Sequence, residues 1–267
     1  MSYFSSIELI YFLLPIIGFI IGVFGSMFGG GGGFFILPIL ILGLGMQAQA
    51  AVITSLVASL PICLVGSWRY YKKGNINFKT GGFFAILGIM GAFFGAGISK
   101  FINNKQLQTF FGIYSIIMAF NIIYNTWRRN KPKFNNISNQ KSTPKFLKIS
   151  KSALFGFSAG TVTGIFGTSG TAPVLAGLFN LKMPIKMVIG TSLLVVMINT
   201  VFAISAHSIQ GSINILVVSL LTIGSITGTF IGSRFMNKVK LEKSEGVVKY
   251  TYALVIMAIG IIMIKGN

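Results

Sequence analysis

The sequence predicts an all-α polytopic membrane protein made of two inverted-topology repeats of five helical segments each. Three observations lead to this fold class. Hydrophobic residues make up 53% of the 267 residues and charged residues only 9%, with a mean hydropathy of +0.81. A soluble domain carries about a quarter charged residues. Apolar stretches run unbroken for about 20 residues, the length of a membrane-spanning helix, and the order of small residues in the first half recurs in the second.

Ten apolar segments follow one another along the chain. Eight of them are long enough, or nearly long enough, to cross a bilayer. We expect them at Glu8–Phe28, Phe34–Gly45, Gln49–Trp68, Thr80–Ser99, Leu107–Trp127, Ser152–Phe166, Thr171–Leu181, Ile185–Ser208, Ile213–Phe235 and Val247–Ile264.

The two short segments, Phe34–Gly45 and Thr171–Leu181, each follow a glycine-rich break. At ~1.5 Å rise per residue, 11 residues cover roughly 16 Å of a hydrocarbon core of about 30 Å. We therefore expect a short or re-entrant helix near the start of each half, and the sequence leaves open whether it spans or re-enters.

A basic hydrophilic stretch separates the halves. Residues 128–151 hold 8 of the 22 Lys and Arg residues. This gives residues 1–127 as the first transmembrane repeat, 128–151 as a cytoplasmic linker and 152–267 as the second repeat.

Twelve identities in unchanged order indicate that the second half is a copy of the first. The glycine-rich break recurs after 135 residues, and the later identities recur after 137 residues. The first copy holds Gly25, Gly29, Gly32, Pro38, Thr54, Ser55, Gly74, Ile76, Asn77, Gly91, Phe93 and Gly95.

The distribution of basic residues predicts the topology. If each half crosses the membrane an odd number of times, 19 of the 22 basic residues fall on one side, and only Lys100, Lys105 and Lys265 on the other. With an even number of crossings the division is 13 to 9. The positive-inside rule favours the first arrangement. The arrangement with an odd number of crossings predicts a multi-pass plasma-membrane protein in which the two halves are inverted and both termini lie outside. Trp68 and Trp127 then lie at the cytoplasmic membrane interface. Paired repeats of this kind are typical of secondary transporters.

The motif Gly25-Ser26-Met27-Phe28-Gly29-Gly30-Gly31-Gly32-Gly33 with Pro38 resembles the sulfite exporter TauE/SafE family of permeases, as do Ala51–Ser55. The second copy is similar, with residues 164–170, Pro173 and Gly190-Thr191-Ser192. The resemblance covers nearly the whole chain. It implies transport of a small sulfur-containing anion such as sulfite, thiosulfate or an organosulfonate, with the glycine breaks and the Thr-Ser pairs as lining.

The glycine breaks are the first candidate binding elements. A helix that begins after such a break directs free N–H groups and a positive dipole end at its surroundings, which suits an anion. Ser26 can add a hydroxyl, although small residues also serve close helix packing. The candidates here are Gly30, Gly31, Gly32, Gly33, Thr168, Ser169 and Gly170.

Hydroxyls and one amide complete the predicted substrate site. The third segment of each half carries a Thr-Ser pair in its first turns, Thr54-Ser55 and Thr191-Ser192. These hydroxyls either coordinate an oxyanion, or they cap the helix and hydrogen-bond to its preceding turn. Asn199 is a mid-segment amide that contacts ligand or joins helices. For Gly91/Gly95 and Gly228/Gly232 the four-residue spacing favours packing alone.

Several function classes are excluded or disfavoured. The three acids are Glu8, Glu242 and Glu245, none deep in a segment, so an intramembrane carboxylate relay is absent. One cysteine (Cys63) and one histidine (His207) leave no multi-ligand metal site and no base-orienting pair, so we expect no metal, cofactor or catalytic residue. The clustering of charge in short loops argues against binding of nucleic acid.

The expected partners are a small anion and the lipid bilayer; a homodimer is compatible with the sequence. The alternatives are a permease for another small anion, such as a carboxylate, and a non-transport assembly factor.

Overall fold

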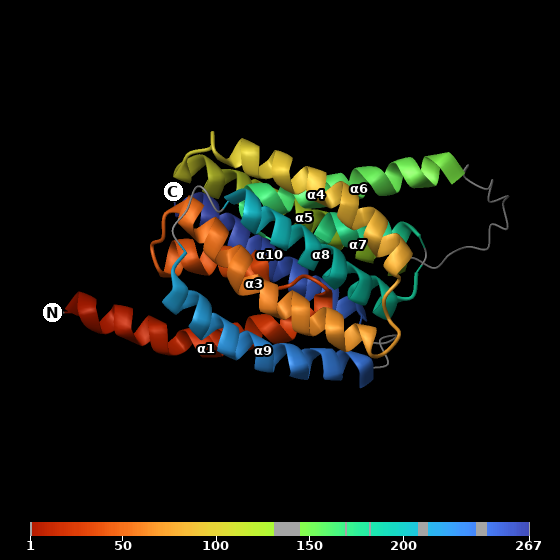
Figure 1. Cartoon of the computed structure of the whole chain (residues 1–267). Coiled ribbons are helices and arrows are strands. Elements are labelled where there is room, and N and C mark those ends of the chain that lie inside the picture. The colour runs from red at the N-terminus through yellow and green to blue at the C-terminus, as the bar shows by residue number, and fades with distance from the viewer. Residues whose placement is uncertain are drawn as a thin grey trace. The chain divides into compact units, whose positions relative to one another are not determined.

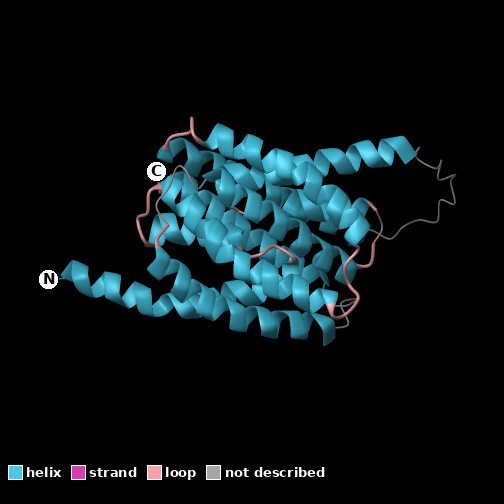
Figure 2. Ribbon diagram, in the orientation of Figure 1, coloured by secondary structure: helices cyan, strands magenta, loops and turns pink. Residues whose placement is uncertain are grey.

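The computed structural model describes residues 2–130, 145–168, 170–181, 183–207, 213–238 and 245–266. Throughout these residues the regular structure is helical, with short connecting loops (Figure 2). The all-α fold class predicted from the sequence is confirmed. The helices are α1 (Ser2–Phe28), α2 (Gly33–Pro38), the π-helix η1 (Ile39–Gly43), α3 (Ala48–Tyr71), α4 (Phe78–Ser99), α5 (Asn104–Asn130), α6 (Lys145–Phe166), α7 (Thr171–Asn180), α8 (Ile185–His207), α9 (Ile215–Lys238) and α10 (Glu245–Lys265).

Six helices are long and apolar enough to cross a membrane. They are Tyr11–Phe28, Ala48–Tyr71, Phe78–Ser99, Asn104–Tyr124, Ile185–His207 and Ile215–Met236. Among the described residues, four shorter apolar helices accompany them, and these include the two predicted short segments as Gly33–Gly43 and Thr171–Asn180. The first short segment is α2 continued by the π-helix η1.

The helices group into two compact units. Residues 1–104 and 151–238 form the larger unit, and residues 105–150 and 239–267 form the smaller one. In the larger unit α3 packs against α8 and α9, and α8 packs against α4. The pair α3 and α8 therefore lies between α1 with α9 on one side and α4 with α6 on the other (Figure 1).

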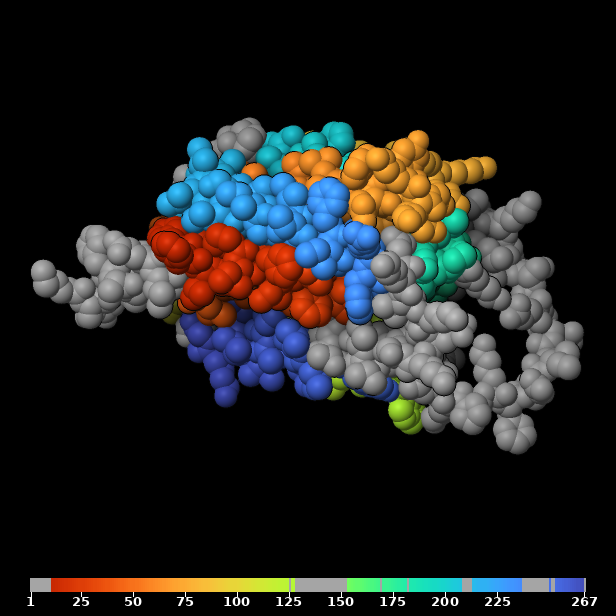
Figure 3. All heavy atoms as spheres, turned by 90° about the horizontal axis from the view of Figure 1, so that it is seen from below, coloured from red at the N-terminus to blue at the C-terminus, as the bar shows by residue number. Residues whose placement is uncertain are grey.

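Glycines allow the outer helix pairs to approach closely. Gly18 and Gly22 of α1 lie against the backbone of α9, and the two helices run side by side along one face (Figure 3). In the same way Gly156 and Gly160 of α6 lie against the backbone of α4. The carbonyls that these four glycines meet belong, in the same order, to Leu221, Ser225, Phe84 and Gly88. A Cβ at any of the four would overlap backbone, so only glycine permits this spacing.

In the same two helix pairs, the partner helices α4 and α9 contribute the glycines that the sequence predicted to serve packing. Gly91 and Gly95 of α4 contact the backbone of α6, and Gly228 and Gly232 of α9 contact the backbone of α1. The packing interpretation of these GxxxG spacings is confirmed. The contacts between α1 and α9 thus have a counterpart in those between α6 and α4, with the halves exchanged, and α1 and α6 run in opposite directions in the larger unit (Figure 1).

The helix ends revise the alignment of the two halves. α1 ends at Phe28 and α6 at Phe166, and each is followed by a glycine with positive φ: Gly29 at 72° and Gly167 at 61°. These positions are 138 residues apart, so the offset of 135 predicted for the first break is three residues short. The sequence alignment could be displaced by three residues because glycines recur every three or four residues in both segments. Many glycines therefore still coincide at the wrong offset.

Equivalent helices begin with equivalent caps. The side-chain oxygen of Asn77 accepts the Thr80 N–H at 3.0 Å at the start of α4. The side-chain oxygen of Asn214 accepts the Val217 N–H at 3.2 Å at the start of α9. A capping amide three residues before its donor fixes where each helix begins.

Candidate functional site

The two glycine breaks lie next to each other inside the larger unit. Gly30 to Gly33 are buried, and Gly29, Gly31 and Gly32 have positive φ values of 72°, 60° and 74°. A Cβ placed on Gly30 would lie 3.2 Å from the Thr171 Oγ1, at the first residue of α7. The first break therefore faces the N-terminus of the second short helix.

Gly32 has a packing role within the first break. A Cβ there would overlap the Ile21 side chain and lie 2.9 Å from the Ile62 Cδ1. The glycine lets the chain turn tightly between α1 and α3. The backbone of the break, rather than any side chain, forms this part of the site.

Each break is held by a serine from the other half. The Ser55 hydroxyl on α3 donates to the Gly167 carbonyl at 2.6 Å, and the Ser192 hydroxyl on α8 donates to the Gly29 carbonyl at 2.9 Å. Both serines are fully buried. Their hydrogens are used to anchor the positive-φ glycines, so in this conformation Ser55 and Ser192 position the breaks and do not offer a free donor to a ligand.

The two predicted threonines differ between the halves. The Thr191 Oγ1 accepts the Asn77 N–H at 3.0 Å and so anchors the loop before α4. Thr54, its counterpart on α3, is fully buried and its hydroxyl has no hydrogen-bond partner. The next residue, Ser55, donates its hydroxyl hydrogen to the Gly167 carbonyl of the second break. Thr54 is therefore adjacent in sequence to a residue that contacts this break.

The second break contributes further unpaired hydroxyls. Thr168 is fully buried and Thr171 is 6% exposed, and neither hydroxyl has a partner. The Gly170 N–H donates to the Thr163 Oγ1 at 2.9 Å. Ser169, also predicted in this site, lies outside the described residues. Thr171 was missed by the sequence analysis, although a hydroxyl residue directly after a break at the start of a helix was the available signal.

Asn199 lies where α8 meets α4. Its side chain packs on Gly88, where a Cβ would overlap the amide, and neither amide atom has a hydrogen-bond partner. The Gly88 carbonyl in turn meets Gly160 of α6, and the adjacent Ala159 carbonyl meets Gly170. These contacts place Asn199 and the second break around the same turn of α6.

A buried polar atom without a partner is unfavourable by about 1–3 kcal/mol. Thr54, Thr168, Thr171 and Asn199 carry five such atoms in adjoining parts of one unit. Native structures keep few such groups, and each one calls for an explanation, such as a water or an ion that binds the polar atom. The first turn of α7 adds N–H groups that no helical carbonyl can reach.

Other predicted residues have structural contacts. The Ser26 hydroxyl donates to the Val23 carbonyl at 3.0 Å, within its own helix. The His207 Nε2 lies 2.7 Å from the Gly164 carbonyl. Because a carbonyl only accepts, Nε2 carries the hydrogen in this contact. Cys63 is a buried free thiol.

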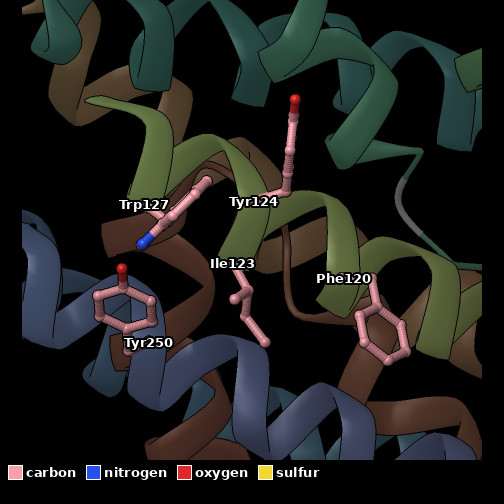
Figure 4. A pocket seen from close by; sticks show the side chains of 5 residues that line it. All are labelled: Phe120, Ile123, Tyr124, Trp127 and Tyr250. Carbon is pink, nitrogen blue, oxygen red and sulfur yellow. The ribbon is translucent and has the colours of Figure 1, made fainter. Parts of the chain in front are cut away.

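An aromatic pocket of about 390 Å³ lies in the smaller unit. Its side chains come from α5 and α10 (Figure 4), and they are Phe120, Ile123, Tyr124, Trp127 and Tyr250. It offers almost no polar lining. Among the described residues no three of His, Cys, Asp and Glu come together as metal ligands.

Comparison with known proteins assigns the chain to a family. The model of the sulfite exporter TauE/SafE family matches residues 14–263. The probable membrane transporter YunE of Bacillus subtilis is 25% identical over 261 residues, covering 92% of this chain and 95% of the relative. The probable membrane transporter MJ0441 of Methanocaldococcus jannaschii is 29% identical over 195 residues, covering 71% and 69%. No solved structure matches the chain.

Proposed function

We propose that this chain, which belongs to the sulfite exporter TauE/SafE family of membrane transporters, is a secondary permease for a small sulfur-containing anion such as sulfite, thiosulfate or an organosulfonate. The anion binds between the two glycine breaks. The observation that carries this proposal is the pair of unpaired hydroxyls at Thr168 and Thr171, buried at the start of α7 beside Gly30.

The chemistry of these groups suits an oxyanion. Threonine hydroxyls and first-turn N–H groups donate hydrogen bonds, and the dipole of α7 places partial positive charge at the same end. No carboxylate occurs in α2, α3, α7 or α8 to repel an anion. The breaks are buried, so exchange with either side requires that the helices around them move.

Purified protein in liposomes tests the proposal. We expect saturable uptake of labelled sulfite or sulfoacetate into proteoliposomes and none into empty liposomes. An excess of unlabelled sulfite should abolish it, and acetate should compete weakly. Absence of flux for every sulfur anion would reject the proposal, and preference for acetate would make the chain a carboxylate permease.

We further propose that the two repeats are inverted in the plasma membrane, with both termini outside. The exchanged contacts between α1 and α9 and between α4 and α6 support this arrangement. The 19 basic residues on one side give the orientation.

Cysteine labelling tests the inversion with a matched pair of sites. Ile76 and Ile213 are equivalent residues in the loops before α4 and α9. In a background with Cys63 replaced by alanine, we expect a membrane-impermeant maleimide to label Ile213→Cys in intact cells. Ile76→Cys should react only after permeabilisation. Equal labelling of both sites would reject the inverted topology.

A further inference from the structure

Two hydrogen bonds recur at equivalent places in the two halves. The Tyr70 hydroxyl, near the end of α3, donates to the Ser26 carbonyl in the last turn of α1 at 3.3 Å. The His207 Nε2, at the end of α8, donates to the Gly164 carbonyl in the last turn of α6 at 2.7 Å. The two donors are 137 positions apart and the two acceptors 138, the same offsets that relate the Thr-Ser pairs and the helix ends. The contact is therefore repeated although the residues that make it differ.

Each donor binds a carbonyl at the end of a helix that leads into a glycine break. The last four carbonyls of a helix have no N–H of a following turn to accept, and they lie at the negative end of the helix dipole. Tyr70 is fully buried and His207 is 4% exposed. Each bond thus fastens the turn before a break to the long helix of the same half, α3 or α8.

The two bonds lie at opposite ends of the pair α3 and α8, which run antiparallel. A Cβ on Gly190, near the start of α8, would lie 2.8 Å from the Tyr70 Cβ, and one on Gly66 would lie 3.0 Å from the Leu193 Cδ1. Gly190 and His207 are 17 positions apart on one helix, about 26 Å at ~1.5 Å per residue. The bonds are therefore separated by most of a hydrocarbon core of about 30 Å.

A buried hydroxyl without a partner accompanies each bond on the same helix face. Ser67 lies three residues before Tyr70, and Thr200 lies seven residues before His207, spacings that place each pair on one side of its helix. Ser67 is 5% exposed and Thr200 is fully buried, and neither hydroxyl has a hydrogen-bond partner. These unpaired atoms are explained if water or an anion reaches them when the adjacent bond opens.

We infer that Tyr70 and His207 are the gating residues of two alternating pathways, one from each membrane face to the glycine breaks. Opening of the Tyr70 bond admits solvent past Ser67, and opening of the His207 bond admits it past Thr200. Both bonds are formed in this conformation and the breaks are buried, so the conformation is closed on both sides. This inference rests on the proposed function, since it takes the breaks as the place that substrate reaches.

Two reporter cysteines test whether each bond closes one side only. Ser67→Cys and Thr200→Cys are made in the Cys63→Ala background, and a membrane-impermeant maleimide is applied to right-side-out and to inside-out vesicles. Tyr70→Phe, which removes only the hydroxyl, should raise the labelling rate of Ser67→Cys and leave that of Thr200→Cys unchanged. His207→Phe should do the reverse, and the two reporters should react from opposite membrane faces. Each rise should be at least about twofold, the contribution of one hydrogen bond to an equilibrium.

Matched variants separate the hydrogen bond from a loss of packing. Tyr71→Phe removes the hydroxyl of the neighbouring tyrosine, which is 57% exposed, and should leave both reporters at the rate found without it. His207→Gln keeps an N–H donor on the side chain, so its reporter should be labelled more slowly than that of His207→Phe.

A rise at both reporters in either phenylalanine variant of Tyr70 or His207 would overturn the inference, because a bond with a purely structural role would loosen both sides together. Unchanged labelling in both variants would overturn it as well. Neither result bears on sulfite transport, which proteoliposomes measure separately. The expected pattern with the two faces exchanged would support the gates and reject the proposed orientation. The expected pattern without flux of any sulfur anion would retain the gates and reject the proposed substrate.

Discussion

Valine in place of Gly30 is expected to reduce anion flux strongly while leaving a folded protein. The three atoms nearest to a Cβ at this position all belong to the Thr171 side chain, and the first of them is its Oγ1 at 3.2 Å. Gly30 does not have positive φ, so the substitution carries no left-handed strain. The added methyl groups would instead occupy the space between the two breaks.

The expected size follows from the cost of overpacking. Extra methyl groups in a filled site cost ~1–3 kcal/mol, which corresponds to roughly a five- to 150-fold loss if it falls on the ligand-bound state. Sulfite flux in proteoliposomes measures the loss, and size-exclusion chromatography in detergent confirms the fold. Gly30→Ala, with one methyl, should lie between the wild type and the valine variant.

A glycine in open space provides the control. A Cβ on Gly97 of α4 would have no atom within 4 Å. Gly97→Val should therefore keep wild-type flux despite the same change of residue. Wild-type flux in Gly30→Val would show that the gap between Gly30 and Thr171 is not the anion path.

Hydropathy and charge were sufficient to place the helices, because burial in lipid requires long apolar segments. The boundaries Phe28, Ser99 and Phe166 agree with the sequence prediction. The start of α6 at Lys145 does not, since a helix can extend beyond its apolar part into a basic segment. The π-helix after Pro38 also had no signal in the hydrophobic pattern.

The meeting of the two glycine breaks was easier to predict than the role of each residue in them. Glycine runs and hydroxyl pairs marked segments that the structure brings next to each other, but a threonine or serine gives no sign in the sequence of whether its hydrogen bonds backbone or ligand. Ser55 and Ser192 anchor glycine carbonyls, whereas Thr191 accepts the Asn77 N–H and the Thr54 hydroxyl has no partner. Those roles depend on contacts between residues more than 100 positions apart.

The second large effect is expected on stability, from alanine in place of Gly167. This residue has φ of 61°, which costs an L-residue about 1–2 kcal/mol. A Cβ there would also overlap the Val52 backbone of α3 and disturb the carbonyl that Ser55 binds, an overpacking cost of ~1–3 kcal/mol. The sum, roughly 2–5 kcal/mol, should lower the midpoint of thermal unfolding in detergent by about 5–15 °C.

Gly74→Ala separates the two causes of this loss. Gly74 has nearly the same φ, 67°, but a Cβ there would meet nothing within 4 Å. It should show only the backbone cost, a drop of about 2–8 °C. Ser55→Ala, which keeps Gly167 and removes the bond to its carbonyl, should also destabilise the protein. If Gly167→Ala melts no lower than Gly74→Ala, α3 does not hold the second break as described, because the excess loss at Gly167 can come only from its contact with Val52 and Ser55.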